Sequence, residues 1–128
     1  MIEAAREVLK NAYSPYSRYR VAAAVLDERG RVSVGCNVEN ASFGATVCAE
    51  RVAVFNAIVH GAKRIQAVII MTESRRPWAP CGMCRQVLLE FCDPKTPVIL
   101  KSTKGPSRRF TLKTLCPHSF SPAQIKKS

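Results

Sequence analysis

The stretch Gln66–Thr72 (QAVIIMT) constrains the fold more than any other segment of this chain. A continuous run of β-branched and other apolar residues is typical of a strand that is buried on both faces. Such a strand needs further elements packed against each face of its sheet. With 47% hydrophobic residues, a chain of 128 residues can bury a core without a disulfide scaffold. This length is usual for one domain, so we expect residues 1–128 to form a single domain.

Four further segments are expected to join this strand in a sheet. Val21–Leu26 and Arg31–Cys36 are apolar and are separated by a short turn that contains Gly30, which is typical of a hairpin. Pro97–Lys101 is expected to form another strand, and Phe110–Leu112 a short fifth one.

Three helices are expected because apolar residues recur at helical spacing in Ala4–Ala12, Cys48–His60 and Cys81–Cys92. Pro15 soon follows the first of these segments and Gly61 directly follows the second, and both residues are typical helix stops. A hairpin followed by alternating helices and strands indicates a layered α/β domain with a mixed, roughly five-stranded sheet.

The six cysteines permit two interpretations. As an even set in a secreted protein they could form three disulfides. In a cytosolic chain, close pairs of cysteines more often hold a metal or do redox chemistry. Met1–Lys10 mixes charges of both signs with apolar residues and so lacks the pattern of a signal peptide, which favours the second interpretation. The sequence contains no run of about 18 apolar residues, the length that a membrane span requires. We therefore expect a cytoplasmic protein.

Three cysteines have the spacing of zinc ligands. Cys81 and Cys84 have the two-residue gap that lets both thiolates reach one tetrahedral zinc ion. They lie at the start of an expected helix, where unpaired N–H groups and partial positive charge favour thiolate over thiol. Cys48, at the start of the other inner helix, can supply a third ligand. Three protein ligands leave the fourth zinc position to water, which is typical of a catalytic site.

Glu50 follows Cys48 by two residues, so it is expected near the metal without binding to it. A carboxylate in that place can accept the proton of a zinc-bound water and pass it on. The order C-A-E, then P-C-G-M-C, is the cysteine version of the signature of zinc-dependent deaminases, in which the glutamate carries the proton.

Each part of this pattern also has a plainer interpretation. A lone C-x-x-C could be a thioredoxin-like redox pair or half of a structural zinc site, but neither explains Cys48 and Glu50. Glu50 alone could be a favourable acid in the first turn of a helix. Trp78, in the loop before the second motif, is expected to pack and not to contact a substrate. The other cysteines and both histidines are treated as non-ligands: Cys36, Cys92, Cys116, His60 and His118.

The net charge of +11 is unevenly distributed, because no acidic residue follows Asp93. Such a balance can attract polyanions. No nucleic-acid recognition motif with interleaved aromatic residues accompanies it, so we interpret the charge as a solvated basic surface and do not expect nucleic acid as a partner. The basic residues in this part are Lys95, Lys101, Lys104, Arg108, Arg109, Lys113, Lys126 and Lys127.

From about Ala12 to Ser121 the chain resembles the small, homotetrameric, zinc-dependent cytidine deaminases. The similarity includes the family patterns A-Y-x-P-Y-S-x-F, G-C-N-[IV]-E-N-A-x-[YF] and L-L-P-x-x-F, besides the two zinc motifs. The matching segments are Tyr13–Tyr19, Gly35–Phe43, Cys48–Arg51, Pro80–Val87 and Leu115–Phe120.

The resemblance implies a three-layer α/β/α fold of the cytidine deaminase type and a hydrolytic reaction used in pyrimidine salvage. Cytidine and deoxycytidine would become uridine and deoxyuridine, with release of ammonia. A zinc-bound hydroxide would attack C4 of the cytosine ring while Glu50 moves a proton to N3 and then to the departing amine. Zn²⁺ would be held by the three cysteines, and no organic cofactor would be required. The family also implies a homotetramer with shared active sites.

The resemblance also implies roles for individual residues. Asn37 and Glu39 would bind the ribose hydroxyls, and Ala41 lies in the same substrate-binding segment. Tyr19 and Val21 would pack against the pyrimidine and the sugar. Arg51 would hydrogen-bond the zinc thiolates and offset their charge. Phe43 and Phe120 would line the pyrimidine site from adjacent subunits, and the alternative is that both are ordinary core phenylalanines.

The chain departs from the family pattern at three positions. Ala22 replaces a usual glycine, Tyr19 a phenylalanine and Cys116 a common leucine. Three rival functions remain: a deaminase of cytosine in DNA or RNA, a blasticidin-type aminonucleoside deaminase, and a non-catalytic zinc-binding interaction module. The segment Asn37–Ala41 resembles a site for a free ribose and argues against the first two. Glu50 beside an open metal position argues against the third.

Overall fold

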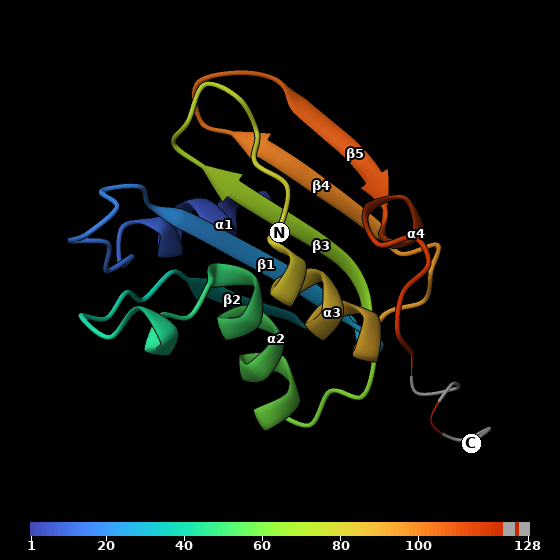
Figure 1. Ribbon diagram of the computed structural model, residues 1–128. Coiled ribbons are helices and arrows are strands. Elements are labelled where there is room, and N and C mark those ends of the chain that lie inside the picture. Colours follow the sequence, from blue (N-terminus) through green and yellow to red (C-terminus); the bar gives the residue numbers. More distant parts are fainter. Residues whose placement is uncertain (122–124, 126–128) are drawn as a thin grey trace.

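Five strands form one mixed sheet in the computed structural model, which describes residues 1–121 and 125 (Figure 1). The strand order is β2-β1-β3-β4-β5. Neighbouring strands are antiparallel, except β3 and β4, which are parallel. The strands are β1 (Val21–Asp27), β2 (Val32–Cys36), β3 (Ile65–Thr72), β4 (Pro97–Ser102) and β5 (Ser107–Thr111).

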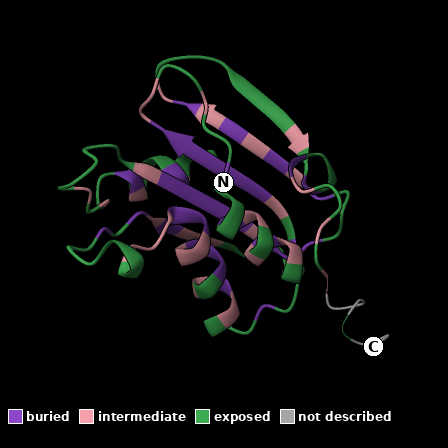
Figure 2. Ribbon diagram, viewed as in Figure 1, coloured by how far each residue is buried: buried purple, intermediate pink, exposed green. Residues whose placement is uncertain are grey.

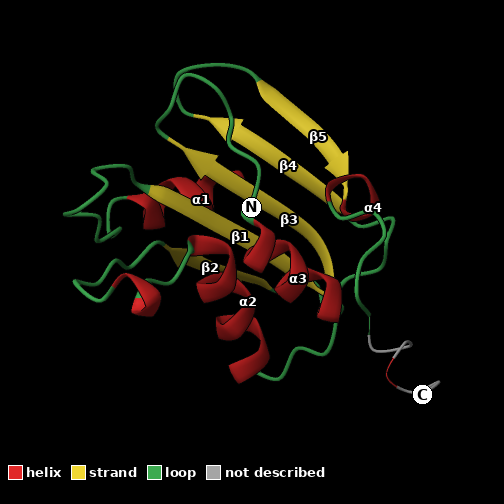
Figure 3. Ribbon diagram, in the orientation of Figure 1, coloured by secondary structure: helices red, strands yellow, loops and turns green. Residues whose placement is uncertain are grey.

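Helices cover both faces of this sheet (Figure 3). Helix α1 (Ile2–Leu9) packs on β1, β2 and β3 from one side. Helices α2 (Ala49–Val59) and α3 (Gly82–Phe91) lie next to each other on the opposite side. The predicted three-layer α/β/α arrangement is therefore confirmed. No helix in the described part of the chain has the length and apolar character needed to cross a membrane.

The alternation of side chains along the central strands divides the core in two. On one face, Ala22 and Met71 pack with Leu9 of α1. On the other face, Ala23 and Ile70 belong to the larger cluster beneath α2 and α3. Small side chains in β1 let helices approach the sheet closely on both sides. Figure 2 shows β3 buried along nearly its whole length, as the apolar run of the sequence predicts.

The last strand and helix differ from the sequence prediction. Strand β5 spans Ser107–Thr111, whereas the sequence predicted a strand at Phe110–Leu112. Leu112 instead begins α4 (Leu112–Leu115), a short helix that the sequence analysis missed. The Oγ1 atom of Thr111 accepts a hydrogen bond from the N–H of Thr114 at 3.3 Å, and this cap ends the strand.

Helix α1 also ends earlier than predicted. It stops at Leu9. Two turn hydrogen bonds follow, from the N–H of Asn11 to the carbonyl of Val8 and from the N–H of Ala12 to the carbonyl of Leu9, but they do not extend the α-helix. The loop predicted between β2 and α2 contains one short 3₁₀ helix, Phe43–Ala45. The hairpin, α2 and α3 agree with the prediction to within one or two residues at each end.

Candidate metal centre and its cavity

The first turns of α2 and α3 bring the three predicted zinc ligands together. Cys48 directly precedes α2, and Cys81 directly precedes α3. The Sγ atom of Cys81 accepts a hydrogen bond from the backbone N–H of Cys84 at 3.4 Å, so this sulfur caps the helix. Two helix N-termini that converge on the same sulfur atoms favour the thiolate form over the thiol.

The sulfur atoms lie close enough together to share one metal ion. The Sγ atoms of Cys48 and Cys81 are 3.9 Å apart, and those of Cys81 and Cys84 are 3.3 Å apart. All three lie within 4.8 Å of one another. Tetrahedral zinc with zinc–sulfur bonds of about 2.3 Å separates its sulfur ligands by roughly 3.8 Å. The donor set therefore fits zinc.

Arg51 places a positive charge beside these sulfur atoms. Its Nη2 atom lies 3.7 Å from the Sγ of Cys48 and 3.3 Å from the carbonyl oxygen of Thr46. A hydrogen bond from the Cys84 thiol, aided by the Arg51 guanidinium, lowers the pKa of Cys48 to about 5. That same hydrogen bond, with burial, raises the pKa of Cys84. The cluster thus holds a thiolate at neutral pH, the form that binds metal.

Glu50 lies in the first turn of α2 and is only 5% exposed. Burial raises the pKa of its carboxyl group, and the nearby charge of Cys48 adds to the rise. A raised pKa makes the carboxylate a stronger base, which suits a group that accepts a proton and passes it on. Its position beside the cysteines agrees with the predicted role of a proton carrier.

A cavity of about 240 Å³ joins these groups to residues from the sheet and two loops. Its wall combines the start of α2 with the ends of β1 and β3, the loop after β2 and the loop that leads to α3. The lining residues are Val21, Asn37, Glu39, Thr46, Cys48, Ala49, Glu50, Ile70, Thr72, Trp78, Ala79 and Cys81. The structure therefore brings Asn37, Glu39 and Val21 to the same cavity as Cys48 and Cys81, two of the predicted metal ligands.

The side chain of Asn37 fixes the backbone that enters β1. Its Oδ1 atom accepts a hydrogen bond from the N–H of Val21 at 3.0 Å, and its Nδ2 atom donates one to the carbonyl of Tyr19 at 2.8 Å. One N–H and one lone pair of the amide remain available beyond these two bonds. Asn37 thus has a structural role in addition to its predicted binding role.

Glu39 holds the preceding loop in the same way. Its Oε1 atom accepts hydrogen bonds from the N–H groups of Tyr16 and Ser17, at 2.9 and 3.0 Å. The hydroxyl of Ser17 donates to Oε2 at 2.5 Å. The hydrogen bonds from Ser17 and Tyr16 lower the pKa of Glu39, so the carboxylate that faces the cavity is charged at neutral pH.

Comparison with known proteins identifies the family. The sequence profile described as "Cytidine and deoxycytidylate deaminase zinc-binding region" matches residues 1–100. The chain belongs to this deaminase family. It is 42% identical to the cytidine deaminase of Halalkalibacterium halodurans over 120 residues, which cover 94% of this chain and 91% of that protein. It is 40% identical to the cytidine deaminase of Sporosarcina psychrophila over 121 residues, which cover 94% of this chain and 89% of that protein.

The fold of a solved deaminase agrees with these sequence matches. The crystal structure of cytidine deaminase from Burkholderia pseudomallei superposes with a TM-score of 0.88 at 42% identity. The match covers 93% of this chain and 95% of the other. The resemblance inferred from the sequence motifs is thereby confirmed, and with it the α/β fold of this deaminase family.

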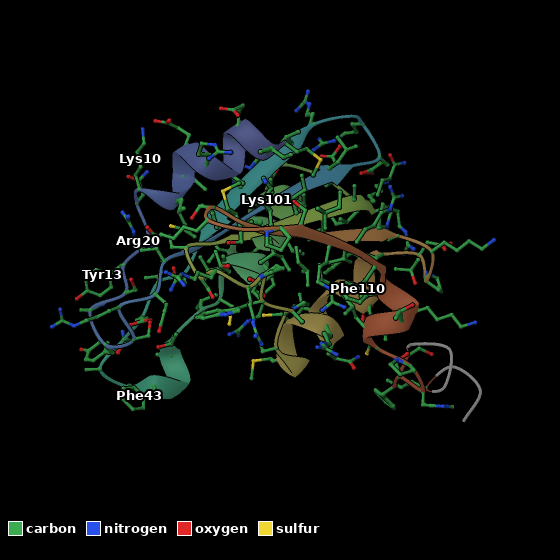
Figure 4. The ribbon with its side chains drawn as sticks, turned by 90° about the horizontal axis from the view of Figure 1, so that it is seen from above. Lys10, Tyr13, Arg20, Phe43, Lys101 and Phe110 are labelled. Carbon is green, nitrogen blue, oxygen red and sulfur yellow. The ribbon has the colours of Figure 1, made fainter. Side chains whose placement is uncertain are left out.

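Not all predicted substrate-binding residues line the deaminase cavity in a single chain. Tyr19 does not line it and only contacts two lining residues, Trp78 through its ring and Asn37 through its carbonyl oxygen. Ala41 is exposed on the loop before the 3₁₀ helix. Phe43 is 76% exposed and Phe120 is 60% exposed, so the alternative that they are core residues is wrong. Figure 4 shows Phe43 at the outer end of its loop, away from the sheet.

The position of Ala22 shows what one departure from the family pattern does. Strand alternation turns Val21 toward the cavity and Ala22 toward α1, where it is fully buried. The extra methyl group of Ala22 therefore fills space beneath α1 and does not enter the deaminase cavity.

Several lining residues were missed by the sequence analysis. Thr46, Thr72 and Ala79 lie in the wall, and the Oγ1 atom of Thr72 is buried without a hydrogen-bond partner among the described residues. Trp78 was expected to pack only. It does pack against Tyr19, but it also lines the cavity. The only sequence signal was its place three residues before Cys81.

The remaining candidate ligands lie elsewhere. Within residues 1–121 and 125, the one group of three or more potential metal-ligating side chains is the cysteine trio described above. All six cysteines are free, so the disulfide interpretation is wrong. Burial raises the pKa of Cys92 to about 12, as for an inert core thiol. Of the basic residues after Asp93, Lys126 and Lys127 lie outside the described residues.

Proposed function

We propose that this chain is a zinc-dependent deaminase that hydrolyses cytidine and deoxycytidine to uridine and deoxyuridine, with release of ammonia. The observation that carries the proposal is the convergence of three thiols and one buried carboxyl group on a single cavity. The similarity to cytidine deaminases over more than nine-tenths of the chain supports the substrate.

Cys48, Cys81 and Cys84 would hold the zinc ion. When bound there, zinc supplies a Lewis acid that makes water a nucleophile at neutral pH. Arg51 offsets the negative charge of three thiolates, which would otherwise make the metal a weaker Lewis acid. Its Nη2 atom already lies beside the Sγ of Cys48, and its buried Nε atom has no hydrogen-bond partner among the described protein atoms.

Glu50 moves the proton. As a carboxylate it accepts a proton from the attacking water, and as an acid it delivers that proton to N3 of the cytosine ring. It then transfers the second proton of the water to the departing amine, which leaves as ammonia. Burial supports this cycle, because it raises the pKa of Glu50 and so makes its carboxylate a stronger base than an exposed glutamate.

The polar residues at the far end of the cavity suit a nucleoside. The charged carboxylate of Glu39 can accept a hydrogen bond from a ribose hydroxyl, and the free N–H of Asn37 can donate one. Val21 offers apolar surface to the ring or the sugar. We assign these three residues to substrate binding, with Tyr19, Ala41, Phe43 and Phe120 at its border.

The test is one assay with two controls. When purified protein is incubated with cytidine, the absorbance of cytidine should fall. The amount of ammonia released should equal the amount of cytidine consumed. Elemental analysis should find about one zinc per chain, and the double variant Cys81→Ala, Cys84→Ala should lose both metal and activity. Active protein without zinc, or zinc retained by the double variant, would overturn the metal assignment.

The rival functions predict different results. A deaminase of polynucleotides would act on cytosine in single-stranded DNA and leave cytidine untouched, and its binding would weaken steeply with salt. A blasticidin-type enzyme would prefer the aminonucleoside over cytidine. An interaction module would bind zinc and turn over none of these compounds. Glu39 favours the free nucleoside, because a negative charge in the cavity disfavours phosphate groups nearby.

We also propose a homotetramer with shared active sites, acting in the cytoplasm in pyrimidine salvage. The exposure of Phe43 and Phe120 supports the assembly, because large aromatic side chains gain by burial in an interface. Six free cysteines support a reducing compartment. Size measurement by light scattering tests the assembly, and a fully active monomer would contradict it.

A further inference from the structure

Trp78 is the only tryptophan of the chain and forms part of the cavity wall. It lies in the loop between β3 and α3, and it is 39% exposed, which leaves a large apolar surface partly open. The other walls come from the sheet and from α2, and their lining residues beside Trp78 are smaller: Val21, Ala49, Ile70 and Thr72. Trp78 is thus the largest side chain of the wall.

An aromatic contact holds Trp78 in place. The rings of Trp78 and Tyr19 meet edge to face, with centroids 4.9 Å apart and an interplanar angle of 62°. The carbonyl of Tyr19 accepts a hydrogen bond from Asn37, which itself lines the cavity. Such aromatic pairs have a preferred geometry, so the indole has a defined direction relative to the cavity.

The two loops that carry this pair are also tied together at their base. Arg20 binds Glu73 through two hydrogen bonds of 2.6 and 2.7 Å. The hydroxyl of Ser102 donates to the carbonyl of Ser74, which anchors the loop to the end of β4. Figure 4 shows Arg20 on the same side of the molecule as Tyr13 and Phe43. The loop is therefore fixed at its start by Glu73 and Ser74, and the Trp78 ring is held at the cavity by its contact with Tyr19.

We propose that Trp78, braced by Tyr19, is a specificity-determining residue: its indole is the wall that limits the size of the pyrimidine nucleoside that the cavity accepts. This inference rests on the proposed deaminase function. A rigid apolar wall excludes water from the reacting ring and rejects substrates that carry an additional bulky group. Its removal enlarges the cavity on the side of the β3–α3 loop without touching the metal ligands or Glu50.

The first test compares substrates of different size. Trp78→Ala should lower kcat/KM for cytidine, and it should lower kcat/KM much less, or raise it, for cytidines with a bulky substituent on C5 or N4. The ratio of the two kcat/KM values should shift by at least about tenfold toward one of the bulky substrates, since a pocket distinguishes groups of that size by such factors. Trp78→Phe should restore most of the wild-type ratio.

The control is Arg76→Ala in the same loop, because the exposed Arg76 side chain does not line the cavity. It should leave the substrate ratio unchanged. A merely structural role for Trp78 would reduce activity toward all substrates equally, together with thermal stability and zinc content. An unchanged substrate ratio in folded, zinc-loaded Trp78→Ala, for every bulky substrate tried, would overturn the inference.

A second test needs no variant. Because Trp78 is the sole tryptophan, its fluorescence should respond directly when the reaction product uridine enters the cavity. The emission change should saturate at the same concentrations as product inhibition of cytidine turnover. Turnover with no emission change would overturn the inference while leaving the deaminase function intact. Absence of cytidine turnover in zinc-loaded wild-type protein would instead overturn the proposed function.

Discussion

Glu50 illustrates how one residue acquires its chemistry from its surroundings. The sequence places it two positions after Cys48, and that spacing was enough to predict a carboxylate near the metal. The spacing could not show that the side chain is 5% exposed or that burial raises its pKa. Those properties depend on how α2 packs against the sheet.

The variant Glu50→Gln should separate catalysis from metal binding. Glutamine has nearly the same shape and is neutral, so a buried site tolerates it, but it cannot accept or deliver a proton. We expect kcat to fall by at least about 10²-fold, as is typical when a general acid–base is lost. Elemental analysis should still find wild-type zinc content. A near-wild-type rate would contradict the proton-carrier role.

Trp78 shows the limit of prediction at the residue scale. The roles of the cysteines and of Glu50 could be predicted, because zinc chemistry requires fixed spacings between such residues at the start of a helix. The wall position of Trp78 depends on Tyr19 and on the Arg20–Glu73 ion pair, which join segments more than fifty residues apart in the sequence. No local pattern encodes such a contact.

At the scale of elements, the predictable parts were those with a strong apolar pattern. The buried strand β3 and the hairpin appeared where expected, since apolar runs bounded by turn residues are typical of strands. Helix α4 was not predictable, because four residues are too few to show a helical period. It forms because Leu112 and Leu115 are buried in the core and because Thr111 caps it.

Strand β2 and helix α2 approach each other most closely at Gly35. A Cβ atom there would lie 2.8 Å from the Cβ of Val52 and still closer to the backbone of Ala49 and Ala53. Gly35→Ala must therefore push α2 away from the sheet. We expect a loss of about 1–3 kcal/mol in the free energy of unfolding, the usual cost of overpacking. Deaminase activity should fall as well, because α2 carries Glu50.

Gly44→Ala is the matched control, since a Cβ atom at Gly44 would meet nothing within 4 Å. Its free energy of unfolding should stay within about 0.5 kcal/mol of the wild-type value. Chemical denaturation of both variants checks the prediction. Equal stability of Gly35→Ala and Gly44→Ala would contradict the close contact between β2 and α2.

The turn between β1 and β2 should make stability depend on pH. The buried carboxylate of Asp27 accepts hydrogen bonds from the N–H groups of Arg29 and Arg31, and it pairs with the Arg29 guanidinium at 2.9 Å. These contacts, led by the Arg29 side chain, lower the pKa of Asp27. A lowered pKa stabilises the fold above the unfolded value of about 3.9, and this contribution is lost as the pH falls through the folded value.

Asp27→Asn should therefore lower the unfolding temperature at neutral pH, and its difference from wild type should shrink below about pH 3.9. Glu7→Gln is the control, because Glu7 only forms an exposed pair with Lys10 and such pairs contribute little. Thermal unfolding at several pH values checks both. A deficit for Asp27→Asn that is the same at every pH would show that its charge is unimportant.

At the scale of the whole molecule, the exposed apolar side chains gather on a few surfaces. Helix α2 exposes Phe55 and Val59, and the start of α3 exposes Met83, on the side away from the sheet. Exposed apolar groups of this size are typical of surfaces that bind another chain. The sequence could suggest an assembly only through the family resemblance, because a contact between chains leaves no periodic pattern in one chain.

The proposed tetramer with shared sites leads to a complementation experiment. Glu50→Ala removes the proton carrier from its own site, and Phe120→Ala removes an aromatic side chain that is 60% exposed in the single chain and is proposed to close a neighbouring site. Each variant alone should have low activity. Mixed tetramers can be formed by dissociating and reassembling the two variants together. Some of their sites should contain both Glu50 and Phe120. The activity of the mixture should therefore exceed the sum of the activities of the separate variants. Reassembling each variant with itself is the control. If the mixture shows no gain although mixed tetramers are detected by mass, Phe120 acts within its own chain and the sites are not shared through it.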